Sequence, residues 1–207
     1  MSGCHHTHAF DGVSPAYKRA LVAVIAINGL MFGVEMTAGF SAGSEALKAD
    51  ALDFAGDALT YTISLAVIGH SLRYRAQAAL FKGVLLSLTA MGVLGLALAD
   101  LLAAQPPVGS TMGLVGALAL IANLASVVIL MRWRDGDANI RSVWLCSRND
   151  AIGNVGVMIA GLLVVLLNSH WPDFLMALAM AGLFLRSSIS IIAQARRELA
   201  ADGEVEA

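Results

Sequence analysis

Six long apolar segments, separated by short polar or charged stretches, dominate this sequence. A helix needs about 20 apolar residues to cross the hydrocarbon core of a bilayer. A soluble helical bundle would need polar faces at helical spacing, which segments such as 84–99 and 155–167 lack. The sequence therefore predicts an all-α membrane protein with six transmembrane helices. We expect these helices at residues 17–40, 50–71, 81–103, 110–131, 143–167 and 173–194.

Composition narrows the class of protein further. Only 14% of the residues are charged and 58% are hydrophobic, whereas soluble domains carry about 25% charged residues. The formal net charge of −2 favours no nucleic-acid partner. The first ten residues are polar, unlike a cleaved secretory signal with its early apolar run. We therefore expect a multi-pass protein of the inner (cell) membrane, surrounded by the lipid bilayer.

The basic residues indicate how the helices are oriented. Ten of them flank one side of the predicted spans, and Lys48 alone flanks the other. Cytoplasmic loops of membrane proteins carry the excess of Lys and Arg, so both termini are expected in the cytoplasm. The ten are Lys18, Arg19, Arg73, Arg75, Lys82, Arg132, Arg134, Arg141, Arg196 and Arg197.

The chain divides into three predicted parts. Residues 1–16 form a cytoplasmic tail, residues 17–195 the six-helix transmembrane domain, and residues 196–207 a second short cytoplasmic tail. The first tail is dense in side chains that ligate metals. A tract of this composition either collects metal ions for the transmembrane domain or is inert. The side chains concerned are Cys4, His5, His6 and His8.

Acidic residues inside the apolar segments are the clearest functional signal. A carboxylate in hydrocarbon is costly, so each one predicts a functional role. Asp53 and Asp57 are four residues apart, which places both on one helix face about 6 Å apart along the axis. Cys146 and Asp150 have the same spacing in the fifth segment. Three carboxylates and a thiolate from two helices make a tetrahedral ligand set that suits zinc or cadmium.

Other roles are open for some of these side chains. Asp50, at the start of the second segment, is also explained as a first-turn acid that the helix dipole favours. A lone cysteine in a membrane helix, such as Cys146, is more often a small apolar residue than a ligand. Capping does not explain Asp53, Asp57 and Asp150, which lie inside spans. A proton-relay pathway without metal would explain these three acids.

The two ligand pairs meet only if their helices begin before the apolar segments do. With helix starts at 50 and 143, Asp57 and Asp150 would miss each other by about 10 Å across a core of about 30 Å. Ser44 followed by Glu45 is typical of a helix N-cap, and Asp137 is typical of another. Starts at 45 and 138 place the four side chains about 12–18 Å from their respective faces. They then meet near the midplane, where transporter sites usually lie.

Taken together, these residues resemble the cation diffusion facilitator family, the zinc and cadmium efflux antiporters. The likeness runs along nearly the whole chain. It implies metal/proton antiport by a homodimer, with no cofactor beyond the transported ion. The motifs that carry it are Asn28, Phe32, Glu35, Gly39 and Gly43-Ser44; Ala49-Asp50-Ala51, Asp53 and Asp57; Asn139, Arg141, Cys146, Asp150 and Gly153-Asn154-Val155-Gly156-Val157; and Trp171-Pro172-Asp173 with Leu185-Arg186-Ser187.

Three features depart from the family pattern. Cys146 stands where the family usually has His, which tilts the metal preference toward cadmium alongside zinc. The loop before the third segment has no acid and only His70 nearby, so we expect no second metal site there. The usual C-terminal cytoplasmic module is not expected in this short form, so membrane helices alone would hold the dimer. Our first candidate contact is a row of small residues in the third segment: Gly83, Ser87, Gly92 and Gly95.

The expected mechanism follows from the ligand chemistry. Metal ions and protons compete for the same thiolate and carboxylate groups, so an empty site in low dielectric should take up protons. The alternatives are a membrane metal sensor and a proton relay without metal transport. No nucleophile with a base and no cofactor motif occurs, so an enzyme is not expected. Arg148 points away from the ligand face and needs a partner, expected to be an acid that the sequence does not identify. Four further polar residues are expected to line a polar route or to bond between helices: Asn28, Glu35, Asn123 and Asn154.

Overall fold

The computed structural model describes residues 14–70, 72–101, 105–134 and 138–205. These residues form six α-helices and one short 3-10 helix, and none of them lies in a β-strand. The prediction of an all-α fold with six helices is confirmed. The elements are α1 (Pro15–Ala42), α2 (Glu45–Ala66), α3 (Leu72–Leu101), α4 (Gly109–Leu130), η1 (Met131–Trp133), α5 (Ala138–Leu167) and α6 (Trp171–Val205).

Five helices in the described part of the chain, all except α2, are long and apolar enough to cross a membrane by length and composition. α2 differs because five charged side chains lie between Glu45 and Asp57. Its 22 residues rise about 33 Å, and it packs against α1, α3, α5 and α6. The neighbouring helices therefore shelter its charges. The chain is a multi-pass membrane protein.

Several helices extend beyond the apolar segments that predicted them. α3 begins at Leu72 rather than at 81, and α6 continues to Val205 rather than ending at 194. Hydropathy marks only the part of a helix that lies in hydrocarbon, whereas polar residues continue the backbone hydrogen bonds beyond it. α2 and α5 begin at Glu45 and Ala138, the earlier starts that the capping signals predicted.

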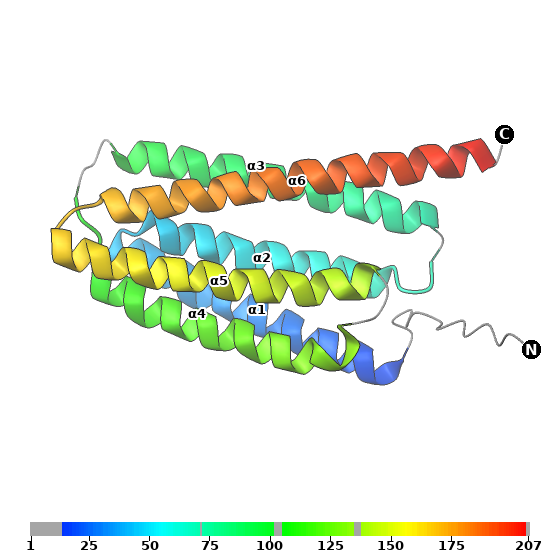
Figure 1. The fold of residues 1–207 in the computed structure, drawn as a ribbon, viewed down its shortest axis with the longest axis horizontal. Coiled ribbons are helices and arrows are strands. Elements are labelled where there is room, and N and C mark those ends of the chain that lie inside the picture. The colour runs from blue at the N-terminus through cyan, green and yellow to red at the C-terminus, as the bar shows by residue number, and fades with distance from the viewer. Residues whose placement is uncertain (1–13, 71, 102–104, 135–137, 206–207) are drawn as a thin grey trace, which may run out of the picture.

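The helices form an antiparallel bundle in which each one runs opposite to the one before it (Figure 1). The most extensive pairings are α3 with α6, α4 with α5 and α1 with α2. α3 and α6 lie together along one side of α1, α2, α4 and α5 (Figure 1). The start of α1 and the end of α6 are at the same end of the bundle (Figure 1). This arrangement fits the predicted topology with both termini on one side of the membrane.

The outer surface of the bundle is apolar. Leu30 on α1, Leu114 on α4 and Leu166 on α5 are 73%, 75% and 68% exposed. In water such a surface would drive association, whereas lipid chains cover it at no cost. Large apolar side chains thus cover the outside of the bundle, while most of the buried polar side chains lie on α1, α2, α4 and α5.

Glycine allows α4 and α5 to approach closely. A Cβ atom added at Gly109 would lie 2.5 Å from the carbonyl oxygen of Gly161, and one at Gly161 would lie 2.8 Å from that of Gly109. No larger residue fits either position without moving the backbone. Small residues at helix contacts are the usual means of packing helices in lipid.

Small residues on α3 serve two different surfaces. A Cβ atom at Gly83 would lie 2.6 Å from Cγ1 of Ile192, and the Ser87 hydroxyl is hydrogen-bonded to that of Ser188, so both positions face α6. Gly92 and Gly95 are exposed, and a Cβ atom added at either one would have no described neighbour within 4 Å. Of the predicted dimer contact, Gly83 and Ser87 therefore pack against α6 of the same chain, and only Gly92 and Gly95 stay candidates for a contact with a second copy.

The start of α6 holds the start of α2. The Ser44 hydroxyl is the N-cap of α2, accepting a 3.1 Å bond from the Leu47 N–H and donating a 2.6 Å bond to Oδ1 of Asp173. The Asp173 carboxylate also accepts bonds from the N–H groups of Glu45 and Ala46, at 2.8 and 3.1 Å. A carboxylate at a helix N-terminus satisfies free N–H groups and interacts favourably with the helix dipole. Asp173 therefore fixes where α2 begins.

Candidate metal centre

The four predicted ligands come from two antiparallel helices, α2 and α5. Asp53 and Asp57 are one turn apart on α2, and Cys146 and Asp150 are one turn apart on α5. Because these helices begin at 45 and 138, each pair lies about 12–18 Å from its own helix start. The starts are at opposite ends of the bundle (Figure 1), so both pairs lie near the middle of the bundle along its length.

Asp150 joins the two pairs. Its carboxyl group lies within side-chain hydrogen-bonding range of both Asp53 and Asp57. The Cys146 thiol is close enough to these three carboxyl groups for their charges to act on it. The three acids are partly buried, while Cys146 is more exposed. The structure thus brings all four predicted side chains into one neighbourhood.

These neighbours do not form a finished ligand shell. Across residues 14–70, 72–101, 105–134 and 138–205, no three His, Cys, Asp or Glu side chains are already arranged to hold a metal ion. The carboxyl groups of Asp53, Asp57 and Asp150 lie close together, and a hydrogen bond between two carboxyl groups requires a proton on one of them. Binding a metal ion would displace that proton and turn the carboxylates toward a common centre.

Tyr61 extends the α2 side of the centre by one turn. Its hydroxyl donates a hydrogen bond to Oδ2 of Asp57, and it also lies within hydrogen-bonding range of Cys146. The side chain is only 2% exposed. Sequence reasoning missed this residue, although its spacing of four from Asp57 places it on the same helix face. Tyr61 orients one carboxylate and contacts the thiol of the opposite helix.

Lys82 of α3 lies beside the centre. It was predicted as one of the basic residues that join the second and third spans. Its helix instead begins at Leu72, so Lys82 lies within the apolar stretch Ala76–Ala99. The ammonium group donates a hydrogen bond to the Ser64 hydroxyl on α2, and the charges of Asp57 and Cys146 act on it.

A chain of buried polar side chains links α5, α2 and α4 next to the ligands. Nδ2 of Asn154 donates to Oδ2 of Asp50 at 2.6 Å, and Nδ2 of Asn123 donates to Oδ1 of Asn154 at 2.9 Å. All three are at most 2% exposed. The prediction that Asn123 and Asn154 bond between helices is confirmed. Asn28 instead donates to the carbonyl of Val24 in its own helix, at 2.8 Å.

Glu35 of α1 completes this polar cluster. Its carboxyl group is fully buried and lies within hydrogen-bonding range of Asp50. Within the described part of the chain, no N–H or hydroxyl group donates to either of its oxygens. Asp50 has the amide of Asn154 as a donor, so Glu35 is the member of this carboxyl pair that lacks one among the described residues.

The other singled-out residues have simpler roles or lie outside the described residues. The guanidinium of Arg148 stacks 5.5 Å from the Trp144 ring and donates to Oδ1 of Asn149 at 3.2 Å. An aromatic ring, rather than an acid, is therefore the partner that Arg148 needed. Asp137 lies outside the described residues, as does the cluster formed by Cys4, His5, His6 and His8.

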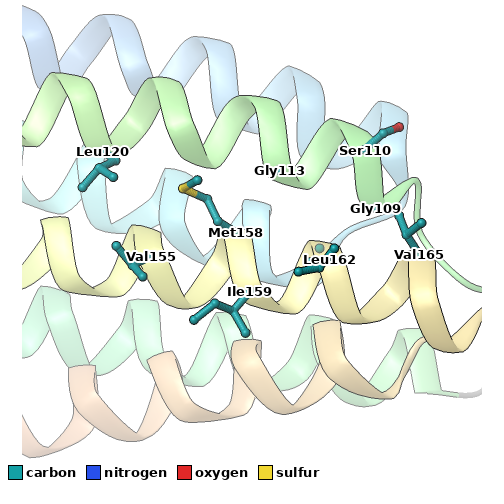
Figure 2. A pocket seen from close by; sticks show the side chains of 10 residues that line it. Gly109, Ser110, Gly113, Leu120, Val155, Met158, Ile159, Leu162 and Val165 are labelled. Carbon is teal, nitrogen blue, oxygen red and sulfur yellow. The ribbon is translucent and has the colours of Figure 1, made fainter.

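A groove of about 470 Å³ lies between α4 and α5 (Figure 2). Its lining is apolar apart from Ser110 and includes Gly109, Met158 and Val165. None of the predicted ligands contributes to it. Because the Ser110 side chain supplies only one hydroxyl group, this lining could not replace the hydration shell of a divalent ion, and the groove is a poor candidate for the metal centre.

Comparison with known proteins places these features in context. A family model described as the cation efflux transmembrane domain matches residues 21–200. The cadmium, cobalt and zinc/H(+)-K(+) antiporter of Bacillus subtilis is 27% identical over 191 residues, which cover 84% of this chain and 60% of that protein. The metal cation efflux system protein CzcD of Cupriavidus metallidurans is 28% identical, covering 92% and 65%. The zinc transporter ZitB of Pectobacterium atrosepticum is 26% identical, covering 94% and 64%. The chain thus spans less than two thirds of the length of these relatives.

Proposed function

Because this chain belongs to the cation efflux family, we propose that it exports divalent transition-metal cations, with zinc as the principal substrate and cadmium as a second. The relatives named above are described as metal cation efflux, zinc transport or cadmium, cobalt and zinc antiport proteins. The multi-pass helical fold supports transport across a membrane. We place the protein in the inner membrane, with the basic end of the bundle in the cytoplasm.

The observation that carries this proposal is the convergence of Asp53, Asp57, Cys146 and Asp150 between α2 and α5. Two oxygen ligands from one helix and one sulfur and one oxygen ligand from the other complete the tetrahedral set that zinc prefers. The thiolate is a soft ligand, and cadmium is softer than zinc, so both ions suit the set.

Protons are the proposed counter-ion. Close contact between the carboxyl groups of Asp53, Asp57 and Asp150 favours bound protons in the empty site, and a metal ion binds only to the deprotonated groups. Cytoplasmic metal would therefore displace protons at the centre, and protons arriving from outside would displace the metal. Moving one charge against the membrane potential costs about 2.3 kcal/mol per 100 mV. Each proton exchanged for the divalent ion lowers this cost.

The remaining expectations stay proposals. We propose a homodimer held by membrane helices, and the division into a tail at 1–16, a transmembrane domain at 17–195 and a tail at 196–207. A metal sensor or a proton relay without metal transport would use the same acids. These alternatives predict no net movement of metal, and an enzyme would in addition need a nucleophile or a cofactor.

Flux in sealed proteoliposomes tests the proposal. Purified protein is reconstituted, a pH gradient is imposed, and zinc movement is recorded with an encapsulated fluorescent indicator. We expect zinc flux that the gradient drives, that added cadmium inhibits, and that collapses with a protonophore. Zinc binding without flux would favour the sensor. Proton flux that is independent of metal would favour the relay.

A further inference from the structure

Lys82 is a cation inside a membrane-spanning helix, and the proposed transport cycle has not used it. It is the only charged residue between 76 and 99, the stretch of α3 apolar enough to cross a membrane. A lysine within a span is costly and is retained where it serves a function. Its environment therefore indicates what that function is.

The side chain of Lys82 points from α3 toward the polar face of α2. It is partly buried, and its ammonium group donates to the Ser64 hydroxyl. Ser64 lies seven residues, or two turns, after Asp57, with Tyr61 between them on the same face. Tyr61 donates to Asp57. Lys82 therefore lies on the side of the metal centre nearer the end where α2 finishes and α3 begins.

Lys82 interacts electrostatically with ionisable groups on two neighbouring helices. The negative charges of Asp57 on α2 and of a Cys146 thiolate on α5 both act on the ammonium group. In the described part of the chain, no carboxylate lies within 4 Å of the ammonium group to form a direct ion pair with it. In a medium of low dielectric, unscreened charges interact over longer distances than in water. Lys82 therefore interacts with one proposed ligand from each of the two helices, Asp57 and Cys146, rather than with a single acid.

We propose that Lys82 is a tethered counter-cation of the metal centre. When the centre is empty, the ammonium group of Lys82 balances part of the negative charge of the ligands. When the centre holds a divalent ion, the same group repels that ion. This inference rests on the proposed function. A transport site must bind its ion tightly enough to load it and weakly enough to release it. A fixed positive charge beside the ligands lowers the affinity for a divalent cation without occupying a ligand position. Lys82 is thus a positioning charge and not a ligand.

Zinc binding by the purified full chain in detergent, measured by calorimetry at one pH and low ionic strength, tests this role. Lys82→Gln and Lys82→Met remove the charge, and Lys82→Arg keeps it. Ser64→Ala removes the hydrogen bond but leaves the ammonium group in place. The matched control is Lys18→Gln. Lys18 is exposed and lies in the first turn of α1, which starts at the same end of the bundle as α3 (Figure 1).

We expect both neutral variants to bind zinc about tenfold more tightly than the native chain, since a repelling charge is removed. Lys82→Arg, Ser64→Ala and Lys18→Gln should stay within about twofold. In proteoliposomes, the neutral variants should load at lower zinc concentration and turn over more slowly. Unchanged or weaker binding by both neutral variants would overturn the inference, and so would tighter binding by Ser64→Ala, which would assign the effect to the hydrogen bond. If the native chain binds no zinc, it is the proposed function that fails.

Discussion

Asn154 of α5 donates a 2.6 Å hydrogen bond to the carboxylate of Asp50 on α2. Asn154 follows Asp150 by one turn, and Asp50 precedes Asp53 by about one turn. The bond therefore links the two helices directly beside the proposed ligands. A hydrogen bond to a charged group contributes about 1.5–3 kcal/mol, and both side chains are buried. We interpret this pair as the contact that sets the axial register of the metal centre.

Removing the amide donor of Asn154 should therefore allow α2 and α5 to shift along their axes relative to each other. We expect Asn154→Ala to lower the free energy of unfolding by about 1–3 kcal/mol, since Asp50 would lose its buried donor. Zinc affinity should fall as well, because Asp150 would no longer be held opposite Asp53 and Asp57. Thermal unfolding and zinc titration of the purified protein measure the two effects. Native stability together with native affinity would show that the bond does not set the register.

Glu35→Gln offers a matched comparison in the same cluster. Neither oxygen of Glu35 receives a hydrogen bond from a donor in the described residues, and a glutamine amide would supply a donor toward Asp50. We expect this variant to be as stable as the native protein or more stable, in contrast to Asn154→Ala. A loss of stability comparable to that of Asn154→Ala would show that the Glu35 carboxyl group has a partner that glutamine cannot replace.

Cys146→His tests the position where this chain departs from the family pattern. A thiolate is softer than imidazole, so we expect histidine to shift the preference from cadmium toward zinc. The ordinary pKa values of a free thiol and a free imidazole are about 8.5 and 6.5. Between pH 8 and pH 7, protons should therefore weaken binding through a thiolate about eightfold and binding through imidazole less than about twofold.

The measurement is the binding of zinc and cadmium to both proteins at several pH values. Native binding should weaken more steeply between pH 8 and pH 7, and the ratio of cadmium to zinc affinity should be higher in the native protein. If selectivity and pH slope are the same with either residue, Cys146 is not a ligand. The centre would then consist of the three carboxylates and a water molecule.

The features that could be predicted from the sequence are those that local chemistry decides. Ser44 caps α2 through a bond to Leu47, three residues away, so the start of the helix could be inferred without knowing its neighbours. The spacing of four between ligands likewise fixes a helix face. Once both starts were placed, the meeting of the two pairs followed from the rise per residue.

The features that could not be predicted depend on how helices rotate against one another. The sequence shows that Lys82 is basic but not that its face of α3 turns toward Ser64. Similarly, Gly83 and Ser87 could equally have faced a second chain, and only the packing of α6 shows that they do not. The partner of Arg148 was missed because an acid was expected where an aromatic ring serves.

The small residues of α3 predict where a second copy would contact the bundle. Gly92 and Gly95 are exposed, whereas Gly83 and Ser87 are covered by α6. In a chain with Cys4 and Cys146 replaced by serine, we expect oxidative cross-linking between copies with cysteine at 92 or 95. Cysteine at 83 or 87 should give none. Absence of cross-links at 92 and 95 in native membranes, or efficient cross-links at 83 and 87, would place the dimer contact elsewhere.

Zinc flux by variants of the Asp57 and Asp150 carboxylates tests most directly the central claim that the metal centre lies between α2 and α5. Asp57→Asn and Asp150→Asn preserve side-chain shape but remove one ligand charge from α2 and α5 respectively, and Asn149→Ala, at an exposed neighbouring position, is the control. In proteoliposomes with an imposed pH gradient, we expect each carboxylate variant to lose at least about 99% of the zinc flux, because an incomplete set of ligands does not hold the ion. The control should retain native flux, and all three proteins should elute from gel filtration as the native protein does. Undiminished zinc flux in both Asp57→Asn and Asp150→Asn would contradict the assignment of the metal centre to α2 and α5.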